Sequence, residues 1–380
     1  MKAFYITNYK NHQITIFDIR KDIILFHKMR FLRCEIFQGG KTMWKRFTIV
    51  LVGLICLILF TGCSEQTSAK PGEDEKVVLR FGYASNSQPV IDSMKEFGRL
   101  LSKKTNGEVE VQYFPDGQLG GERVLIELTQ TGAIDFTKVS GSALEGFSRD
   151  YSIFGIPYLF DNEEHYYQVL ENEEIMNRVY KSTEDLGIVG LTYYDSGSRN
   201  FYMKEGPIES PEDLKGKKIR VMQSEIAIRM VELLGGSPTP MGSGEVYTSL
   251  QQGIIDGSEN NEFVLVTAGH GGVAKYFSYD EHTRVPDIVV MNQETLSKLT
   301  EEQRQAVYEA AEESTEFQKK VWSEAVEEEK QEAAEKHGVV FNEVDKKPFQ
   351  EAVQPIHDDF KEDRELGDLY EKIRSLSAGE

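Results

Sequence analysis

Strands and helices alternate regularly in the first half of the chain, and this alternation limits the folds open to it. Short apolar or alternating runs at residues 77–83, 109–114 and 133–140 are typical of strands. Between them, residues 91–101 space their apolar side chains as one buried helix face does, and residues 120–128 form a second helix. Parallel strands need such crossover helices, so the pattern predicts a parallel α/β lobe.

The ligand side of a parallel lobe lies in the loops that follow the carboxyl ends of its strands. We therefore expect Tyr83, the helix start at Glu122 and Ser140 to lie near one another. The apolar run at residues 153–160 contains Pro157, which disfavours a helix. We expect this run to belong to the core and assign it no ligand role.

A second alternation of helices and strands carries two arginines at the ends of apolar, strand-like runs. Arg199 follows the turn Asp195-Ser-Gly197, and Arg220 lies in KGKKIRVMQSE. The guanidinium of an arginine is a planar, permanently charged fork whose donors match the two oxygens of a carboxylate, so a small organic acid is a natural ligand. Pairing with the protein's own Asp or Glu would explain the two arginines equally well. The residues alone leave both interpretations open.

The longest predicted helix begins after Thr300 and runs to about Lys336. Thr300 and Gln303 can form a capping box at its start. Its apolar residues are dispersed among many charges, and it is too long for one small lobe. We therefore expect this helix to span two lobes.

Chain length also favours two lobes. Single hydrophobic cores stop growing near 250 to 300 residues, and the chain has 380. We assign residues 77–196 plus 285–324 to lobe I and residues 197–284 plus 325–380 to lobe II.

A complete lipoprotein signal peptide stands at residues 43–63, inside the chain rather than at its start. A short positive segment precedes an apolar run, which is shorter than the roughly 18 residues of a spanning helix and ends in Thr-Gly-Cys63. This predicts lipidation at Cys63 and a flexible tether over residues 64–76; an uncleaved anchor is the alternative. Residues 1–42 fit neither, so we expect a misassigned extension, with translation starting at Met43 rather than Met1.

The charge balance excludes several partners. The formal net charge is −20, and the first 50 residues are basic, so the remainder is more acidic still. This argues against nucleic acid and against a basic membrane-binding patch. Cys34 and Cys56 lie in the segment that we expect to be removed. The mature chain then has neither a disulfide framework nor a cysteine-based metal site.

No motif indicates catalysis, a cofactor or a metal. The chain has no GxSxG motif, no P-loop and no dinucleotide fingerprint after a strand. His270 and His282 have no third ligand at a metal spacing and are interpreted as surface or core histidines. Glu245 and Glu259 could be imagined as the carboxylate pair of a sugar hydrolase. In a chain with 63 acidic residues that signal carries little weight.

An ordered set of motifs resembles one known family, over about residues 77–376. The motifs are GQLG at 117–120, PYLF at 157–160, GSR at 197–199, DLKGKKIRV at 213–221, GSPTPM at 236–241, EVY at 245–247 and DGSEN at 256–260. Together they are similar to the solute-binding proteins of TRAP (tripartite ATP-independent periplasmic) transporters, the DctP-like family. No single motif is decisive, but the ordered set is specific.

The resemblance implies an α/β fold: a two-lobed clamp with a hinge and a long lobe-spanning helix. It implies that Arg220 grips the ligand carboxylate, that Arg199 supports it and that Asn260 hydrogen-bonds the ligand. The family's variable specificity contacts fall, by position, on Glu122, Ser140, Gln223, Ser224 and Ser243.

The resemblance also narrows the ligand. Sialic acid members carry a bulky Phe where this chain has Ser243 and a Glu where it has Ser140, which argues against sialic acid. The segments RVMQS, ENN and SYDEHTRVP are similar to members that bind hexuronates. Polar Gln223 and Asn260 suit hydroxyl recognition.

The expected protein is therefore an extracytoplasmic, lipid-anchored binding protein and not an enzyme. We expect it to be a monomer without cofactor or metal, to capture a hexuronate of the glucuronate or galacturonate type, and to deliver it to the small and large membrane subunits of a TRAP permease. The alternatives are a C4-dicarboxylate or other carboxylic acid as ligand, a sugar hydrolase that uses two carboxylates, and a sensor that presents the acid to a receptor kinase.

Overall fold

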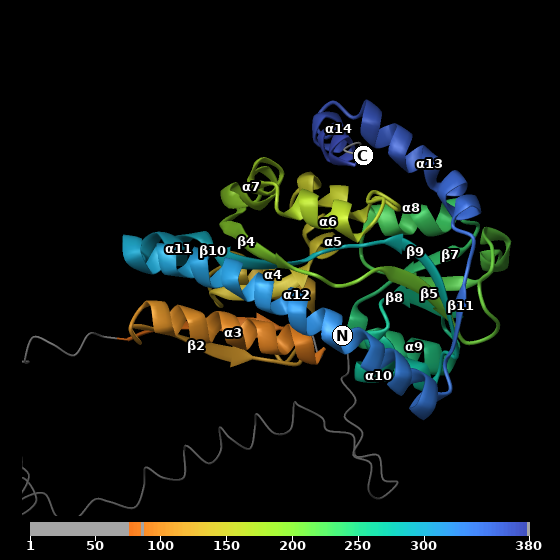
Figure 1. Ribbon diagram of the computed structural model, residues 1–380, viewed down its shortest axis with the longest axis horizontal. Coiled ribbons are helices and arrows are strands. Elements are labelled where there is room, and N and C mark those ends of the chain that lie inside the picture. Colours follow the sequence, from red (N-terminus) through yellow and green to blue (C-terminus); the bar gives the residue numbers. More distant parts are fainter. Residues whose placement is uncertain (1–75, 85–86, 378–380) are drawn as a thin grey trace, which may run out of the picture. The chain divides into compact units, whose positions relative to one another are not determined.

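The computed structural model describes residues 76–84 and 87–377, which form two β-sheets with helices packed around them (Figure 1). The predicted N-terminal extension, the signal peptide with Cys63 and nearly all of the tether lie outside the described residues. None of the helices in the described part of the chain is long and apolar enough to cross a bilayer.

The first sheet has the strand order β2-β1-β3-β10-β4. Strands β1 (Val77–Tyr83), β2 (Val109–Phe114) and β3 (Phe136–Ser140) pair in parallel, which confirms the predicted parallel lobe. Strand β10 (Asp287–Asn292) inserts between β3 and β4 (Ile188–Tyr194) and is antiparallel to both. The sheet is therefore mixed, because a strand from much later in the chain completes it.

Helix α3 (Gln88–Lys104) covers one face of this sheet with the helical spacing that the sequence predicts. Its residues Met94, Phe97 and Leu101 are fully buried in one cluster with Phe81 and Phe136 of the strands. Helix α4 (Glu122–Gln130) follows β2 and begins beside the carboxyl end of β3, where the Glu122 carboxylate accepts a hydrogen bond from the Ser140 N–H. The predicted proximity of Glu122 and Ser140 is thus confirmed.

The second sheet has the strand order β11-β9-β5-β8-β6-β7. Strands β6, β7 and β8 run parallel, and β5 is antiparallel to both of its neighbours, β8 and β9. The bounds are β5 Arg199–Met203, β6 Lys218–Val221, β7 Ser237–Pro240, β8 Gly257–Asn260, β9 Tyr276–Thr283 and β11 Val340–Glu343.

Helix α12 (Glu301–His337) spans both sheets, as predicted. Its residues Ala310 and Trp322 are buried in the core of the first sheet, and Ala333 is buried in a core of the second. The capping box between Thr300 and Gln303 is present at its start. The prediction for the longest helix is therefore confirmed, including its cap.

The chain passes between the sheets in two further places, after β4 and after β9, and side chains tie these passages to α12. Asp195, after β4, forms an ion pair with Arg284, after β9, at 2.5 Å. The amide of Gln318 in α12 bonds both the N–H and the carbonyl of Asp195, each at 2.8 Å. Gly197, in the connection after β4, has a φ of 65°, which favours glycine, and a Cβ there would approach Trp322 of α12 to 3.3 Å. All three connections therefore meet at Asp195.

Asn172 separates two helices that lie before β4. It caps the second of them, since its side chain accepts a hydrogen bond from the Ile175 N–H. The result is α6 (Glu163–Leu170), α7 (Glu173–Lys181) and a short 3₁₀ turn before β4. The run at residues 153–160 is mostly core, as expected, with Phe154 fully buried.

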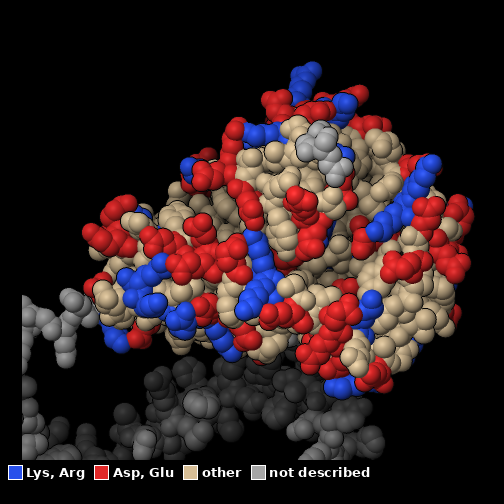
Figure 2. All heavy atoms as spheres, in the orientation of Figure 1, with Lys and Arg blue, Asp and Glu red and all other residues tan. Residues whose placement is uncertain are grey.

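The remaining helices pack around the two sheets. Their bounds are α5 Gly141–Leu144, α8 Glu225–Leu233, α9 Val246–Gln252, α10 Phe263–Thr267, α11 Gln293–Lys298, α13 Lys347–Glu362 and α14 Gly367–Leu376. Helix α13 packs against α8, and α14 packs against α6. Figure 2 shows acidic side chains over much of the visible face, with Lys and Arg scattered among them. A site for an organic anion must therefore be a local, sheltered exception.

Candidate functional site

Arg220 is a buried cation whose hydrogen bonds within the described residues go to a backbone carbonyl. It lies on β6 between β7 and β8, and the residue is 4% exposed. Its Nε and Nη2 both donate to the Met241 carbonyl, at 3.1 and 2.9 Å. No carboxylate within residues 76–84 and 87–377 forms an ion pair with it, and burial lowers the pKa of its guanidinium. Of its five N–H groups, three are left without an acceptor from the described protein.

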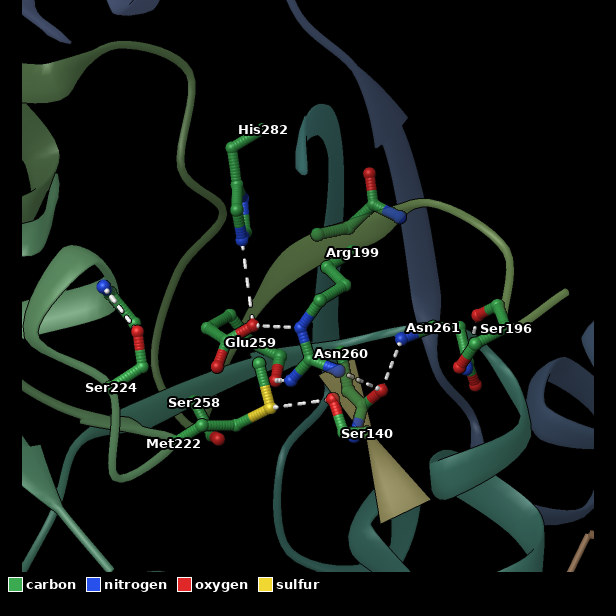
Figure 3. A network of polar contacts seen from close by, with 12 residues as sticks. Ser140, Ser196, Arg199, Met222, Ser224, Ser258, Glu259, Asn260, Asn261 and His282 are labelled. Atoms are coloured by element: carbon green, nitrogen blue, oxygen red, sulfur yellow. Dashed lines mark hydrogen bonds and ion pairs between the residues drawn. The ribbon is translucent and has the colours of Figure 1, made fainter. Parts of the chain in front are cut away.

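Arg199 is equally buried, but its guanidinium is bonded by the protein itself. It opens β5 and donates from Nε to Glu259 Oε2 at 2.5 Å, from Nη2 to the Glu259 carbonyl at 2.9 Å and from Nη1 to Asn260 Oδ1 at 3.0 Å (Figure 3). Both of its partners lie on the neighbouring strand β8. The interpretation that these arginines pair with the protein's own acids thus holds for Arg199 and not for Arg220.

His282 and Asp280 extend the Arg199 ion pair into a buried cluster of four charged groups. His282 Nδ1 lies 2.7 Å from Asp280 Oδ2, and its Nε2 lies 3.5 Å from Glu259 Oε2. Burial alone would lower the pKa of His282, but the Asp280 and Glu259 carboxylates outweigh it and raise the pKa to about 9. Burial alone would raise the pKa of Glu259, but Arg199 and His282 lower it to about 2. His282 and Glu259 are therefore both charged near neutral pH.

Sequence reasoning missed the partners of this cluster. His282 was expected at the surface or in the core, and it is a core residue with no exposed area. Ser278, Asp280 and His282 stand at every second position of β9 and are all buried. Three polar residues at every second position of a strand were the available signal. The described residues contain no group of three or more metal-ligating side chains placed to hold an ion.

The first sheet contributes polar groups that come close to β6. The Oγ of Ser140, at the end of β3, lies 3.6 Å from Sδ of Met222, two residues after Arg220 (Figure 3). Glu122 accepts from the Ser140 N–H at 2.8 Å, and burial raises the pKa of its carboxyl. The two sheets therefore meet beside Arg220, Glu122 and Ser140, three residues that we expected to share one site.

Three other predicted contact residues are placed differently. The Ser224 hydroxyl caps α8 by accepting from the Ala227 N–H at 3.1 Å, so its oxygen already has a structural role. Gln223 and Ser243 are exposed, and no hydrogen bond ties either of them to the other predicted residues. The structure therefore gathers Arg220, Arg199, Asn260, Glu122 and Ser140, but not Gln223 and Ser243.

A small cavity lies beside this cluster. It has a volume of about 10 Å³ and is lined by residues of both halves of the fold, among them Ser142, Met222, Ser224, Glu259 and Thr283. That is room for about one water molecule. A larger hollow of about 580 Å³ lies against α6, but Glu163, Glu164 and Glu171 line it, and their charges repel an anion. Glu259 and Met222 connect the small cavity to the Arg199 cluster and to the end of β6, whereas Arg220 itself does not line it.

The chain is similar to proteins of known sequence and structure. It is 54% identical over 300 residues to "Uncharacterized protein YiiZ" of Salmonella typhimurium, which covers 79% of this chain and 92% of that protein. A TRAP periplasmic solute binding protein from Anaerococcus prevotii, solved with bound α/β-D-glucuronate, is 42% identical with a TM-score of 0.77, covering 80% of this chain and 99% of the other. One from Xanthobacter autotrophicus, with bound β-D-galacturonate, is 35% identical with a TM-score of 0.74, covering 78% and 99%.

Residues 81–363 match the family described as "Bacterial extracellular solute-binding protein, family 7", DctP. The match covers most of the chain and contains both sheets except the first strand's opening residues. Together with the likeness to solved TRAP binding proteins, it establishes that this chain belongs to the DctP family of TRAP transporter solute-binding proteins.

Proposed function

We propose that this protein captures a hexuronate of the glucuronate or galacturonate type outside the cytoplasm and delivers it to the membrane subunits of a TRAP permease. The observation that carries the proposal is Arg220, a buried guanidinium whose bonds within the described protein go to the Met241 carbonyl alone. A buried charge without a counter-ion is costly. An incoming carboxylate removes that cost.

The charges around Arg220 favour an acid with a single carboxylate. The other buried charges pair with one another: Arg199 with Glu259, His282 with Asp280, and Lys138 with Asp287. Burial raises the pKa of the Glu122 carboxyl. Arg220 forms no ion pair with any described residue. A C4-dicarboxylate would bring a second negative charge for which this site has no partner.

The nature of the single acid is suggested by the relatives. Two solved TRAP binding proteins, 42% and 35% identical to this chain, hold glucuronate and galacturonate. Asn260 supports a ligand with hydroxyl groups, since its Oδ1 accepts from Arg199 while its side-chain N–H groups have no acceptor among the described residues. These observations point to a sugar acid rather than to an apolar one.

Capture requires the two halves to separate. A cavity of about 10 Å³ holds about one water molecule, so a sugar acid enters only if the sheets move apart. We assign the moving halves to residues 77–196 plus 285–324 and to residues 197–284 plus 325–380. On closing, Arg220 forms two parallel charge-assisted hydrogen bonds with the carboxylate, each contributing about 1.5 to 3 kcal/mol.

We further propose that the mature chain begins at Cys63, is lipid-anchored there to the outer face of the cytoplasmic membrane and acts as a monomer. The signal peptide pattern supports the start at Cys63 and the lipid anchor. Cys63→Ser should abolish incorporation of labelled fatty acid, whereas Cys56→Ser should keep it. Absence of labelled fatty acid from the natural protein would refute the lipid anchor.

The ligand class can be tested by calorimetry on the purified protein with D-glucuronate, D-galacturonate, succinate and D-glucose. We expect both uronates to bind with one site per chain, succinate to bind at least tenfold more weakly, and glucose, which lacks the carboxylate, not to bind. Tighter binding of succinate than of either uronate would overturn the proposal in favour of a dicarboxylate. Turnover of a glycoside would overturn it in favour of a hydrolase.

A further inference from the structure

A further buried ion pair lies on the first sheet, and the function proposed above gives it no contact with the ligand. Lys138 Nζ is 2.6 Å from Asp287 Oδ2, and the two side chains are 6% and 10% exposed. Lys138 belongs to β3 and Asp287 opens β10, so two strands distant in sequence supply the pair. It lies at the carboxyl end of β3, the edge at which α/β sheets bind ligands.

Strand geometry places this pair next to the contact between the sheets. Lys138 and Ser140 are two residues apart on β3, so they share a face of the sheet. Asp287 is directly opposite Ser140 in the antiparallel register of β3 and β10, and directly paired residues also share a face. Ser140 Oγ in turn lies 3.6 Å from Met222 Sδ, just after Arg220 in the chain. The ion pair therefore lies next to the contact between Ser140 and Met222, two residues after Arg220.

The electrostatics agree with this placement. Lys138, Asp287 and Arg220 all act on the pKa of the Glu122 carboxyl, which burial raises. Asp287 also acts on the pKa of Arg199. Because such interactions fade with distance, the ion pair and both arginines lie in the same part of the molecule.

The pair has hydrogen-bonding capacity that the described protein does not use. The Lys138 ammonium has three donors and donates one hydrogen bond, to Asp287. Asp287 Oδ1 accepts none from the described residues. A buried ion pair is stabilising only when further hydrogen bonds satisfy its remaining donors and acceptors. Hydroxyl groups, which both donate and accept, would complete the bonding of this pair.

We propose that Lys138 and Asp287 bind ring hydroxyls of the sugar acid whose carboxylate Arg220 holds. The inference rests on the proposed function, because it assigns the polar end of that same ligand. Lys138 donates to a hydroxyl oxygen and Asp287 accepts from a hydroxyl hydrogen. The pair thereby selects sugar acids over acids of similar size that lack hydroxyls.

The test combines one variant of the protein with ligands that each lack one hydroxyl, and it compares the loss of affinity in the two proteins. Affinities of D-glucuronate and its 2-, 3- and 4-deoxy analogues are measured by calorimetry for the natural protein and for Lys138→Met/Asp287→Asn. This double variant removes both charges at once and leaves neither of them unpaired. In the natural protein we expect the loss of at least one hydroxyl to weaken binding tenfold or more. In the variant, loss of the same hydroxyl should cost less than threefold.

Arg80→Met is the matched control. Arg80 pairs with Asp135 near the opposite end of β3 in the same sheet, so its loss should leave every hydroxyl penalty unchanged. The proposal is wrong if the hydroxyl penalties are the same in the natural protein and the double variant. It is also wrong if no deoxy analogue binds more weakly to the natural protein.

A crystal structure of the natural protein with D-glucuronate tests the contact without any variant. We expect a ring hydroxyl within about 3.2 Å of Lys138 Nζ or Asp287 Oδ1; hydroxyls that contact neither would overturn the inference. The two proposals fail in different ways. Absence of hexuronate binding removes the proposed function, whereas binding with unaltered hydroxyl penalties removes the Lys138 and Asp287 subsite alone.

Discussion

Arg199 and Arg220 lie on two strands of the same sheet and are buried to the same extent, yet their surroundings differ completely. The fork of Arg199 is bonded to Glu259 and Asn260. The fork of Arg220 bonds only a backbone carbonyl within the described residues. The difference teaches that burial of an arginine does not identify its role. What matters is whether the protein has already supplied the carboxylate.

The largest expected effect separates the two arginines by their contribution to stability. Arg199→Met leaves the Glu259 carboxylate buried without its main partner, and breaking a buried pair costs about 3 to 5 kcal/mol. Arg220→Met loses the bonds to a carbonyl but also removes a buried charge that forms no ion pair with the described residues, so we expect a smaller loss. Urea unfolding of both variants at pH 7 measures these free energies. Equal losses would remove the distinction between the two sites.

The next effect is the pH dependence of the Arg199 cluster. The folded pKa of His282 is about 9 and its ordinary value is 6.5, so protonation stabilises the fold. This contribution, about 3 kcal/mol from 1.36 kcal/mol per pKa unit, is complete below pH 6.5 and is lost as the pH rises through 9. The free energy of unfolding should fall accordingly between pH 6.5 and 9.

The comparison is between His282→Gln, which should abolish this decline, and His337→Gln, which should keep it. His337 ends α12, away from the cluster. A decline that persists in the His282→Gln protein would assign the titration to another group and refute the charged cluster.

The smallest expected effect concerns Asn260, which bonds Arg199 and is also predicted to bind the ligand. Its Oδ1 accepts from Arg199 Nη1 at 3.0 Å. Asn260→Asp places a negative charge on that oxygen, which Arg199 tolerates but an incoming carboxylate does not. We expect unchanged stability and binding of D-glucuronate weakened about fivefold, roughly 1 kcal/mol. Asn260→Ser adds no charge and serves as control; if both variants weaken binding equally, charge is not the cause.

Much of the fold follows from local patterns in the sequence. The apolar spacing of Met94, Phe97 and Leu101 defines the buried face of α3, and the Thr300 and Gln303 box marks where α12 begins. These features depend on neighbours within a few residues. The position of β10 between β3 and β4 depends instead on a pairing between distant segments, which no local pattern contains.

The candidate site divides in the same way. Arg199 and Arg220 attract attention because each is a cation at the end of an apolar run. Which of them is free depends on Glu259, one strand away, and on Asp280 and His282 from β9. The solvent exposure of these side chains could not be predicted either. Gln223 and Ser243 match the family's contact positions, and yet both are exposed. Partners brought together by strand pairing can be found only from the structure.

The central claim is that the Arg220 guanidinium serves the ligand's carboxylate. Calorimetry of D-glucuronate binding to Arg220→Lys tests it most directly, because lysine keeps the charge and loses the two-pronged geometry. The account predicts an affinity at least tenfold weaker than that of the natural protein, with the melting temperature nearly unchanged. An affinity equal to that of the natural protein would contradict it.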